Sequence, residues 1–257
     1  MFVAKLANCS ILKKIVESIK DLVSDINLEI SASGINLQAM DSSHVALVTL
    51  YLNPEGFESY RCDKPITLGI QISQLSKIIH CGGNDDSITL SNEKEGKMLI
   101  KFENSTKKRT SQFYLSLITI DTEHLGIPDT QYGSVIKMPS SLFSKICKDL
   151  YSMNETMNIE TNEEYIKFSL SNETIGGGIK IEKNDSNDLE DQVQITCDNS
   201  INLSFALRYL NMFTKAATCC QQVGLFLSSE YPLMVEYKLD NLGGLKFYLA
   251  PRIEENK

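Results

Sequence analysis

Helix-like segments followed by alternating strands occur in both halves of the chain. The segment SILKKIVESIKDL, residues 10–22, has apolar side chains three or four positions apart, which predicts an amphipathic helix. A similar segment, SLFSKICKDLYSM, lies about 131 residues later at 141–153. Alternating apolar and polar positions follow both segments and predict short strands. The spacing therefore predicts one domain that occurs twice.

A repeated phrase supports the duplication. The chain has CDKPITL at 62–68 and CDNSINL at 197–203, which agree at four of seven positions. Each phrase leads through a predicted strand into a predicted helix, at 72–81 and 206–220. We therefore expect an α+β fold with two similar halves, each carrying two helices among many short strands.

The segment between the halves, residues 118–135, is interrupted by two glycines and a proline and lacks clear periodicity. It is expected to be a connector, but a solvated spacer does not need Leu125, Ile127 and Tyr132. These apolar side chains are expected either to pack against the protein or to bind a partner. The predicted division is a domain at 1–117, a connector at 118–134 and a second domain at 135–257.

Composition is typical of a globular protein, with 257 residues of which 42% are hydrophobic. No apolar run approaches the roughly 20 residues of a membrane helix, and the first residues do not resemble a secretory signal. The seven cysteines lack metal-ligand spacing and suggest reduced thiols in the cytosol or nucleus. The net charge of −8 argues at first sight against a nucleic-acid partner.

The positive charge is concentrated on the predicted helices. They carry eight basic and three acidic residues, a net charge of +5, which leaves −13 for the rest of the chain. The basic residues share exposed faces opposite apolar ones: Lys13, Lys14, Lys20, Lys77, Lys145, Lys148, Arg208 and Lys215. If the four faces line one surface, they form a positive track for a phosphate backbone. Because aromatic residues are not interleaved with these charges, we expect duplex DNA to be held loosely and without sequence preference.

No catalytic constellation is evident. Only three histidines are available as bases, namely His44, His80 and His124, and a serine beside His44 does not establish a nucleophile–base pair. The glycines at 176–178 lack the following Lys-Ser/Thr of a phosphate loop and suggest a bulge or close backbone approach in an edge strand. The acidic run 182–192 reads as a solvated loop with weak affinity for calcium at most. We therefore expect no enzymatic activity, no cofactor and no metal site.

The chain resembles the proliferating cell nuclear antigen family, the eukaryotic DNA sliding clamps, over essentially its whole length. The resemblance rests on phrases in the order and spacing of the family: SILKKIVESIKDL, NLQAMDSSHVALV, FESYRCDKP, HLGIPDTQY, VIKMPSSLFSKICKDL, ALRYLNMFTKA, PLMVEYKL and YLAPRIEE. It implies the DNA-clamp fold, with a βαβββ unit repeated twice in each domain. It also implies a head-to-tail homotrimeric ring whose helices line the central hole.

The family's inner surface matches a set of positions that the resemblance assigns to DNA binding: Lys13, Lys14, Lys20, Lys77, His80, Arg109, Lys145, Lys148, Arg208 and Lys215. His80 stands where a lysine is usual, and Ser152 where another basic residue or histidine often lies. Both departures make the expected track slightly less positive at neutral pH.

The resemblance also implies a pocket for the motif Q-x-x-(apolar)-x-x-(aromatic)-(aromatic) of polymerases, flap endonuclease and ligase, and for the clamp loader. Its expected residues come from four parts of the chain: Met40, His44, Val45, Leu47, Leu125, Ile127, Pro128, Pro232, Tyr248, Ala250, Pro251 and Ile253. Leu249 and Arg252 lie within the same C-terminal segment. In this reading His44 belongs to the rim of a binding pocket and is not a catalytic base.

For the subunit interface, the resemblance pairs the strand near 111–117 with the one near 174–181. Tyr114 and Gly177 are the candidate contacts, with Cys81 and Lys148 nearby. The family's usual ubiquitin-acceptor lysine falls on Glu163, so either another lysine such as Lys167 replaces it or that signal works differently.

The expected function is therefore a nuclear, non-enzymatic processivity factor that encircles duplex DNA and tethers replication and repair enzymes. The nearest alternative is a specialised paralogue or a subunit of a heterotrimeric checkpoint clamp. Two alternatives from other classes are a thiol-dependent hydrolase using Cys219 or Cys220 and a monomeric β-rich scaffold that does not bind DNA.

Overall fold

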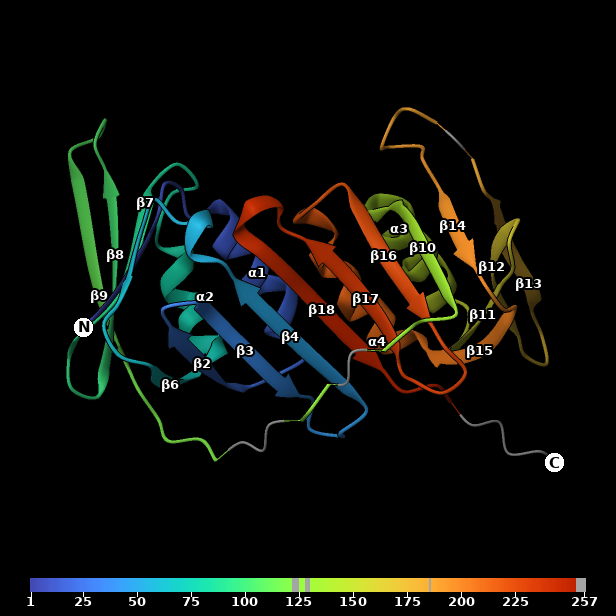
Figure 1. The fold of residues 1–257 in the computed structure, drawn as a ribbon, viewed down its shortest axis with the longest axis horizontal. Coiled ribbons are helices and arrows are strands. Elements are labelled where there is room, and N and C mark those ends of the chain that lie inside the picture. The colour runs from blue at the N-terminus through green and yellow to red at the C-terminus, as the bar shows by residue number, and fades with distance from the viewer. Residues whose placement is uncertain (122–124, 128–129, 185, 253–257) are drawn as a thin grey trace. The chain divides into compact units, whose positions relative to one another are not determined.

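The structure, a computed structural model, divides the chain into two compact units (Figure 1). It describes residues 1–121, 125–127, 130–184 and 186–252. The first unit contains Met1–Ser42, Val48–Leu125 and Leu239–Leu245, and the second contains Ser43–Leu47, Gly126–Lys238 and Lys246–Lys257. Two strands, β4 and β18, are thus divided between the units.

The elements of the first half occur in this order: β1 (Phe2–Leu6), α1 (Ser10–Ile19), β2 (Asp25–Ser31), β3 (Gly34–Met40), β4 (Ala46–Leu52), the 3-10 turn η1 (Pro54–Gly56), β5 (Ser59–Cys62), β6 (Ile66–Gln71), α2 (Ile72–His80), β7 (Ser87–Lys94), β8 (Lys97–Asn104) and β9 (Arg109–Ser116). Within the first unit, one antiparallel sheet has the order β5-β1-β7-β8-β9, and strands β3, β2 and β6 pair in another.

The second half follows the same order: β10 (Ser134–Pro139), α3 (Ser140–Tyr151), β11 (Thr156–Thr161), β12 (Tyr165–Ser171), β13 (Gly176–Glu182), β14 (Gln194–Cys197), β15 (Ile201–Ala206), α4 (Leu207–Phe213), η2 (Thr214–Thr218), β16 (Gln222–Leu227), β17 (Leu233–Lys238), η3 (Asp240–Leu242) and β18 (Gly243–Leu249). Strands β14-β10-β16-β17 pair in one sheet and β13-β12-β11-β15 in another. Each half therefore contains βαβββ twice, which confirms the predicted α+β duplication.

Equivalent backbone hydrogen bonds strengthen this conclusion. The first residue of each copy of the repeated phrase, Cys62 or Cys197, is the last residue of β5 or β14. Each thiol donates to the carbonyl two residues later, at 3.1 and 3.0 Å. The following amides, of Asp63 and Asp198, donate to the carbonyls that precede β1 and β10. The repeated phrase is thus the same structural corner in both halves, and no reactive role is needed to explain its cysteines.

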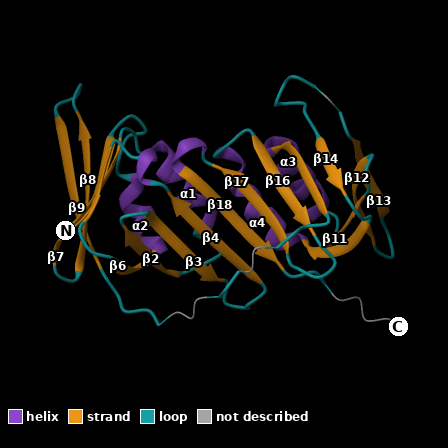
Figure 2. Cartoon of the chain, in the orientation of Figure 1, coloured by secondary structure: helices purple, strands orange, loops and turns teal. Residues whose placement is uncertain are grey.

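The helices of each unit pack against one face of a sheet (Figure 2). In the first unit the apolar face of α1, including Leu12, Ile15 and Ile19, lines the same interior as Ile26 of β2 and Leu37 of β3. In the second unit, α3 contacts β10 and β16, and Phe213 of α4 stacks on Phe247 of β18 with ring centroids 4.6 Å apart. Each helix therefore keeps its polar face away from the core, as its periodicity predicts.

The predicted helix at 206–220 is wrong at its C-terminal end. The α-helix ends at Phe213 and continues as the 3-10 turn η2. The hydroxyl of Thr214 donates to the carbonyl of Asn211 at 2.8 Å, a local bond that competes with helix propagation. Lys215 consequently lies on the turn and not on the α-helical face shared by Arg208 and Asn211.

Candidate functional site

The basic residues of the first unit lie on α1 and α2 and differ in what their side chains contact. Lys14 and Lys77 are exposed. The Lys13 ammonium donates to the Gly82 carbonyl at 2.6 Å and to the Asn84 side chain at 3.0 Å. Lys13 therefore helps to hold the turn after α2 as well as contributing positive charge.

A single carboxylate, that of Glu17 on α1, joins the two helices. One of its oxygens lies 2.6 Å from the Lys20 ammonium, and the other lies 2.8 Å from the Ser76 hydroxyl and 2.9 Å from Nε2 of His80. Partial burial opposes ionisation, but hydrogen bonds from Lys20, Ser76 and His80 outweigh it and lower the pKa of Glu17 to about 2. The hydrogen bond to Glu17 in turn raises the pKa of Lys20.

Arg109 lies on β9 and not on a helix. Its guanidinium donates to the Asp86 carboxylate at 2.6 Å, and that carboxylate, which is 2% exposed, also accepts bonds from Asn104 and from the amide of Gly83. The Arg109 side chain is 50% exposed, so its outer face is open to solvent although one edge is paired. The structure thus gives Arg109 a role in closing the turn after α2, which the sequence did not predict.

The second unit carries its cations differently. Lys145 and Lys148 on α3 are exposed, and within the described part of the chain neither is paired with a carboxylate. Arg208 on α4 lies over the Tyr209 ring and donates to its hydroxyl at 3.1 Å. Ser152 uses its hydroxyl to cap the Asp149 carbonyl at 2.7 Å.

An apolar cluster on the second unit contains two of the predicted pocket residues. Leu47 and Tyr248 pack with Met234, and the half-buried rings of Tyr132 and Phe226 pack against them. The two rings meet edge-to-face with centroids 5.6 Å apart. Sequence reasoning missed Met234 and Phe226, because each occupies a strand position that is equally consistent with the core.

The C-terminal segment is fixed beside this cluster. The amide of Ala250 donates to the Val45 carbonyl at 3.3 Å, and the amide of Arg252 donates to the Ser204 carbonyl at 2.7 Å. Pro251, between these two bonds, is half-buried. Arg252 also donates to the Thr156 hydroxyl at 2.6 Å. The structure therefore brings together the predicted pocket residues of the turn before β4 and of the C-terminal segment.

The beginning of the connector is anchored on the first unit. The amide of Ile118 donates to the Gly69 carbonyl at 2.9 Å, and a Cβ at Gly69 would lie 2.2 Å from the Ile118 carbonyl oxygen. Further along, the side-chain amide of Gln38 bonds both the carbonyl and the amide of Leu125, at 3.0 and 2.8 Å. These bonds, which the sequence did not predict, leave the Leu125 side chain 42% exposed.

The remaining pocket candidates are exposed or fall outside the described residues. Met40 and Ile127 are 36% and 40% exposed, and Pro232 is exposed. His44 is exposed in a turn with φ of 58°. Pro128, Ile253 and His124 lie outside the described residues. Exposed apolar side chains favour a binding surface over core packing.

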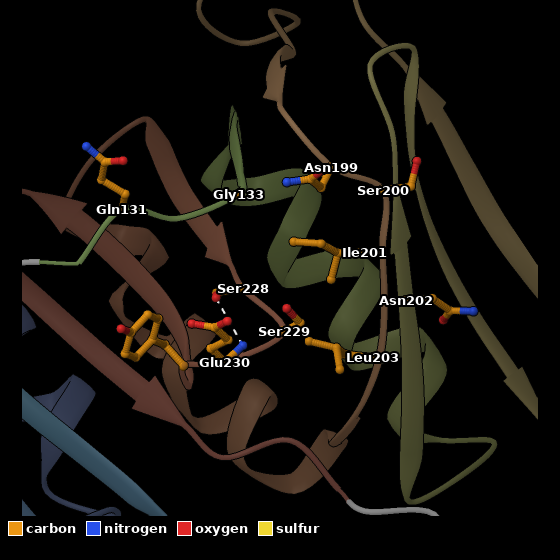
Figure 3. Close-up of a pocket in the computed structure, with 11 residues that line it drawn as sticks. Gln131, Gly133, Asn199, Ser200, Ile201, Asn202, Leu203, Ser228, Ser229 and Glu230 are labelled. Atoms are coloured by element: carbon orange, nitrogen blue, oxygen red, sulfur yellow. Dashed lines mark hydrogen bonds between the residues drawn. The ribbon is translucent and has the colours of Figure 1, made fainter.

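A polar pocket of about 340 Å³ lies on the second unit (Figure 3). It is lined by residues 199–203 of the β14–β15 turn and β15, and by residues 228–231 of the β16–β17 loop, where the amide of Glu230 donates to the Ser228 hydroxyl at 3.1 Å. Gln131 and Gly133, the neighbours of Tyr132, also line it. It contains none of the predicted pocket residues, and its lining provides few apolar anchors.

The candidate interface residues lie on edge strands of their sheets. Tyr114 belongs to β9, where it is 43% exposed and carries the Lys94 ammonium 4.5 Å from its ring centroid. Gly177 belongs to β13, where a Cβ would meet no atom within 4 Å. At Gly178 a Cβ would lie 2.7 Å from the Phe168 carbonyl oxygen, so the predicted close approach is confirmed, while the unbroken register with β12 shows no bulge. Cys81 is exposed directly after α2.

The described residues were compared with the requirements of a metal site, a reactive thiol and a membrane span. They contain no group of three or more histidine, cysteine, aspartate or glutamate side chains placed to hold a metal ion. Burial raises the pKa of Cys147 and of Cys9, which keeps both thiols protonated. Among these residues no helix has the length and apolar character needed to cross a bilayer.

Comparison with known families accounts for both halves. Residues 1–124 match the N-terminal domain of proliferating cell nuclear antigen, and residues 126–252 match its C-terminal domain. The two matches meet in the connector and together cover nearly all of the chain. They agree with the duplicated α+β architecture and confirm the clamp fold. The chain therefore belongs to the proliferating cell nuclear antigen family of DNA sliding clamps.

Proposed function

We propose that the protein is a homotrimeric sliding clamp of the nucleus that encircles duplex DNA and tethers replication and repair enzymes. Membership of a family of non-enzymatic processivity clamps supports this proposal. The observation that carries the finer assignment is the apolar cluster of the second unit, next to which the C-terminal segment is held by the Ala250–Val45 hydrogen bond.

The partner surface has the properties that a short motif requires. Leu47, Met234 and Tyr248 form a buried apolar base, at 8%, 8% and 9% exposed, and the exposed Ile127 and Pro232 belong to the same unit. The aromatic plugs of a Q-x-x-(apolar)-x-x-(aromatic)-(aromatic) motif would gain burial there, and backbone groups near Ala250 would fix its orientation. The proposed partners are polymerases, flap endonuclease, ligase and the clamp loader, which bind clamps of this family through such motifs.

Ring closure is supported by the edge strands. In a head-to-tail trimer, β9 of one subunit would pair with β13 of the next, so that Tyr114 meets the glycine-rich edge around Gly177. The basic residues of all four helices would then face DNA, and topological linkage would make weak phosphate contacts sufficient.

Native mass and a peptide titration together test the proposal. Light scattering is expected to give about three times the 28.8 kDa chain mass, as head-to-tail closure requires. A Q-x-x-I-x-x-F-F peptide is expected to lose about tenfold in affinity for the Ile127→Ala/Pro251→Ala variant, because two apolar contacts are truncated.

Leu189→Ala serves as the matched control, since Leu189 is another apolar side chain that is 45% exposed, on the β13–β14 loop. Unchanged peptide affinity in the double variant would remove the pocket. A chain that stays monomeric alone would instead favour a subunit of a heterotrimeric clamp or a monomeric scaffold.

A further inference from the structure

The carboxylate of Glu17 occupies the donors that a DNA phosphate would use. It holds the Lys20 ammonium at 2.6 Å and Nε2 of His80 at 2.9 Å, while the buried Ser76 hydroxyl fixes its position at 2.8 Å. Carboxylate and phosphate oxygens both accept charge-assisted hydrogen bonds from such groups. A phosphate that binds Lys20 and His80 therefore competes with Glu17 for one of the three N–H donors of Lys20 and for Nε2 of His80.

The Glu17 carboxylate is ionised at neutral pH. Hydrogen bonds from three side chains lower the pKa of Glu17 to about 2 despite its partial burial. The side chains of Glu17, Lys20 and His80 are 36%, 32% and 55% exposed, so all three remain within reach of a ligand. The contact is thus accessible and exchangeable.

The second unit lacks this arrangement. The 131-residue offset between α1 and α3 places Lys148 at the position of Glu17. Lys145 and Lys148 are exposed, and in the described part of the chain they lack a carboxylate partner. The two units therefore present cations of different availability.

We propose that Glu17 is a built-in competitor of DNA, which keeps Lys20 and His80 partly occupied and so weakens the grip of the first unit on phosphate. This inference rests on the proposed function, because it presupposes that α1 and α2 face the duplex. Each passing phosphate exchanges with an internal carboxylate, so the contact forms and breaks without leaving an unpaired charge. Glu17 is thus a positioning residue that favours sliding over tight binding.

A DNA titration tests the proposal. The full-length protein is titrated into a fluorescent duplex of about 30 base pairs at several salt concentrations, and anisotropy gives the affinity. Glu17→Gln is expected to bind about threefold to tenfold more tightly, because it releases the Lys20 cation and the His80 side chain in each subunit. The slope of log affinity against log salt is expected to steepen by about 0.9 for each additional phosphate contact.

Three variants separate release of these cations from a general change in charge. Glu163→Gln makes the same change of charge on an exposed turn between β11 and β12 and is expected to leave affinity within about twofold. Glu17→Asp keeps the charge but shortens the side chain, and is expected to show an intermediate gain. Glu17→Gln/Lys20→Gln is expected to lose most of the gain.

Thermal unfolding confirms that each variant is folded, and Glu17→Asp provides the test if Glu17→Gln is not. Unchanged affinity in both Glu17 variants, or an equal gain in Glu163→Gln, would overturn the competitor role. Failure of the wild-type protein to bind any duplex would instead contradict the proposed function, so the two failures are distinguishable.

Discussion

The two halves of the chain share their backbone bonds and differ in their charges. The amides of Cys9 and Ser140 donate to the carbonyls of Asp86 and Gln221, which occupy equivalent turns after α2 and α4. In the first half, Asp86 and Glu17 place carboxylates on neighbouring cations. In the second half, Gln221 and Lys148 occupy the corresponding positions. The duplicated architecture therefore depends on backbone pairing and apolar packing, whereas the surface charge is free to diverge.

The turn after the second helix shows the consequence most clearly. In the first unit the Asp86 carboxylate accepts bonds from Arg109, Asn104 and Gly83 and is 2% exposed. In the second unit the equivalent turn lines an open pocket of about 540 Å³, together with Glu190 and Asp191. One turn is closed by a carboxylate network and its counterpart is open.

The largest expected effect comes from breaking that network. Asp86→Ala is expected to lower the free energy of unfolding by about 2–3 kcal/mol, because it removes the buried carboxylate that accepts hydrogen bonds from Gly83, Asn104 and Arg109. Gln221→Ala, the matched change in the other half, is expected to stay within about 0.5 kcal/mol, since Gln221 is exposed. Urea denaturation measures both. Equal losses would show that the two turns do not differ in this way.

Acid is expected to weaken the first unit through the same carboxylate. Hydrogen bonds from Asn104 and Gly83, together with the Arg109 charge, outweigh burial and lower the pKa of Asp86 from 3.8 to about 2. Ionised Asp86 therefore contributes about 2 kcal/mol to the free energy of unfolding. This contribution is fully present above about pH 4 and is lost as the pH falls towards 2. Between pH 6 and pH 3, the free energy of unfolding measured by urea denaturation is expected to fall less steeply for Asp86→Asn than for wild type. Parallel pH profiles would contradict this assignment.

The smallest expected effect sharpens the contrast between the helical faces. Lys145→Gln/Lys148→Gln is expected to reduce duplex affinity about tenfold, whereas Lys20→Gln/Lys77→Gln, with the same change in charge, is expected to reduce it about threefold. The difference follows from the prior pairing of Lys20 with Glu17. Anisotropy titrations at one salt concentration measure both variants. An equal loss would show that this pairing does not limit the phosphate contact.

Much of the fold is predictable from the sequence, because the same order of helical and alternating hydrophobic patterns occurs in both halves. The helices begin within one residue of their predicted starts, since apolar spacing and the preceding strands define them. The end of α4 is not predictable in the same way, because the local hydrogen bond of Thr214 has no signature in hydrophobic periodicity. The division of β4 and β18 between the two units was also not predicted, since the sequence of both strands is that of ordinary core strands.

The candidate site divides along similar lines. Exposed cations such as Lys14 and Lys145 could be identified from helical spacing, and Ile127 from its apolar character in a connector. The hydrogen bonds that hold other site residues could not be predicted. Glu17 and His80 are 63 positions apart, and Gln38 and Leu125 are 87 positions apart. In the sequence, Glu17 is only one of three acidic residues that reduce the positive charge of the predicted helices. Its contacts with Lys20 and His80 depend on how α1 packs beside α2.

The glycine run of β13 has a consequence for how this family of proteins can change. Only Gly178 is held to glycine by its neighbours, because a Cβ there would collide with the Phe168 carbonyl and Ser169. On the same edge strand, a Cβ at Gly177 would meet no atom within 4 Å, and one at Gly176 would only contact the Ser171 hydroxyl at 3.8 Å. A single-base change in either codon would add a side chain to the edge without disturbing the sheet behind it. If β13 pairs with β9 of the next subunit as proposed, two copies that arise by gene duplication could cease to recognise one another in one mutational step, while each kept its fold.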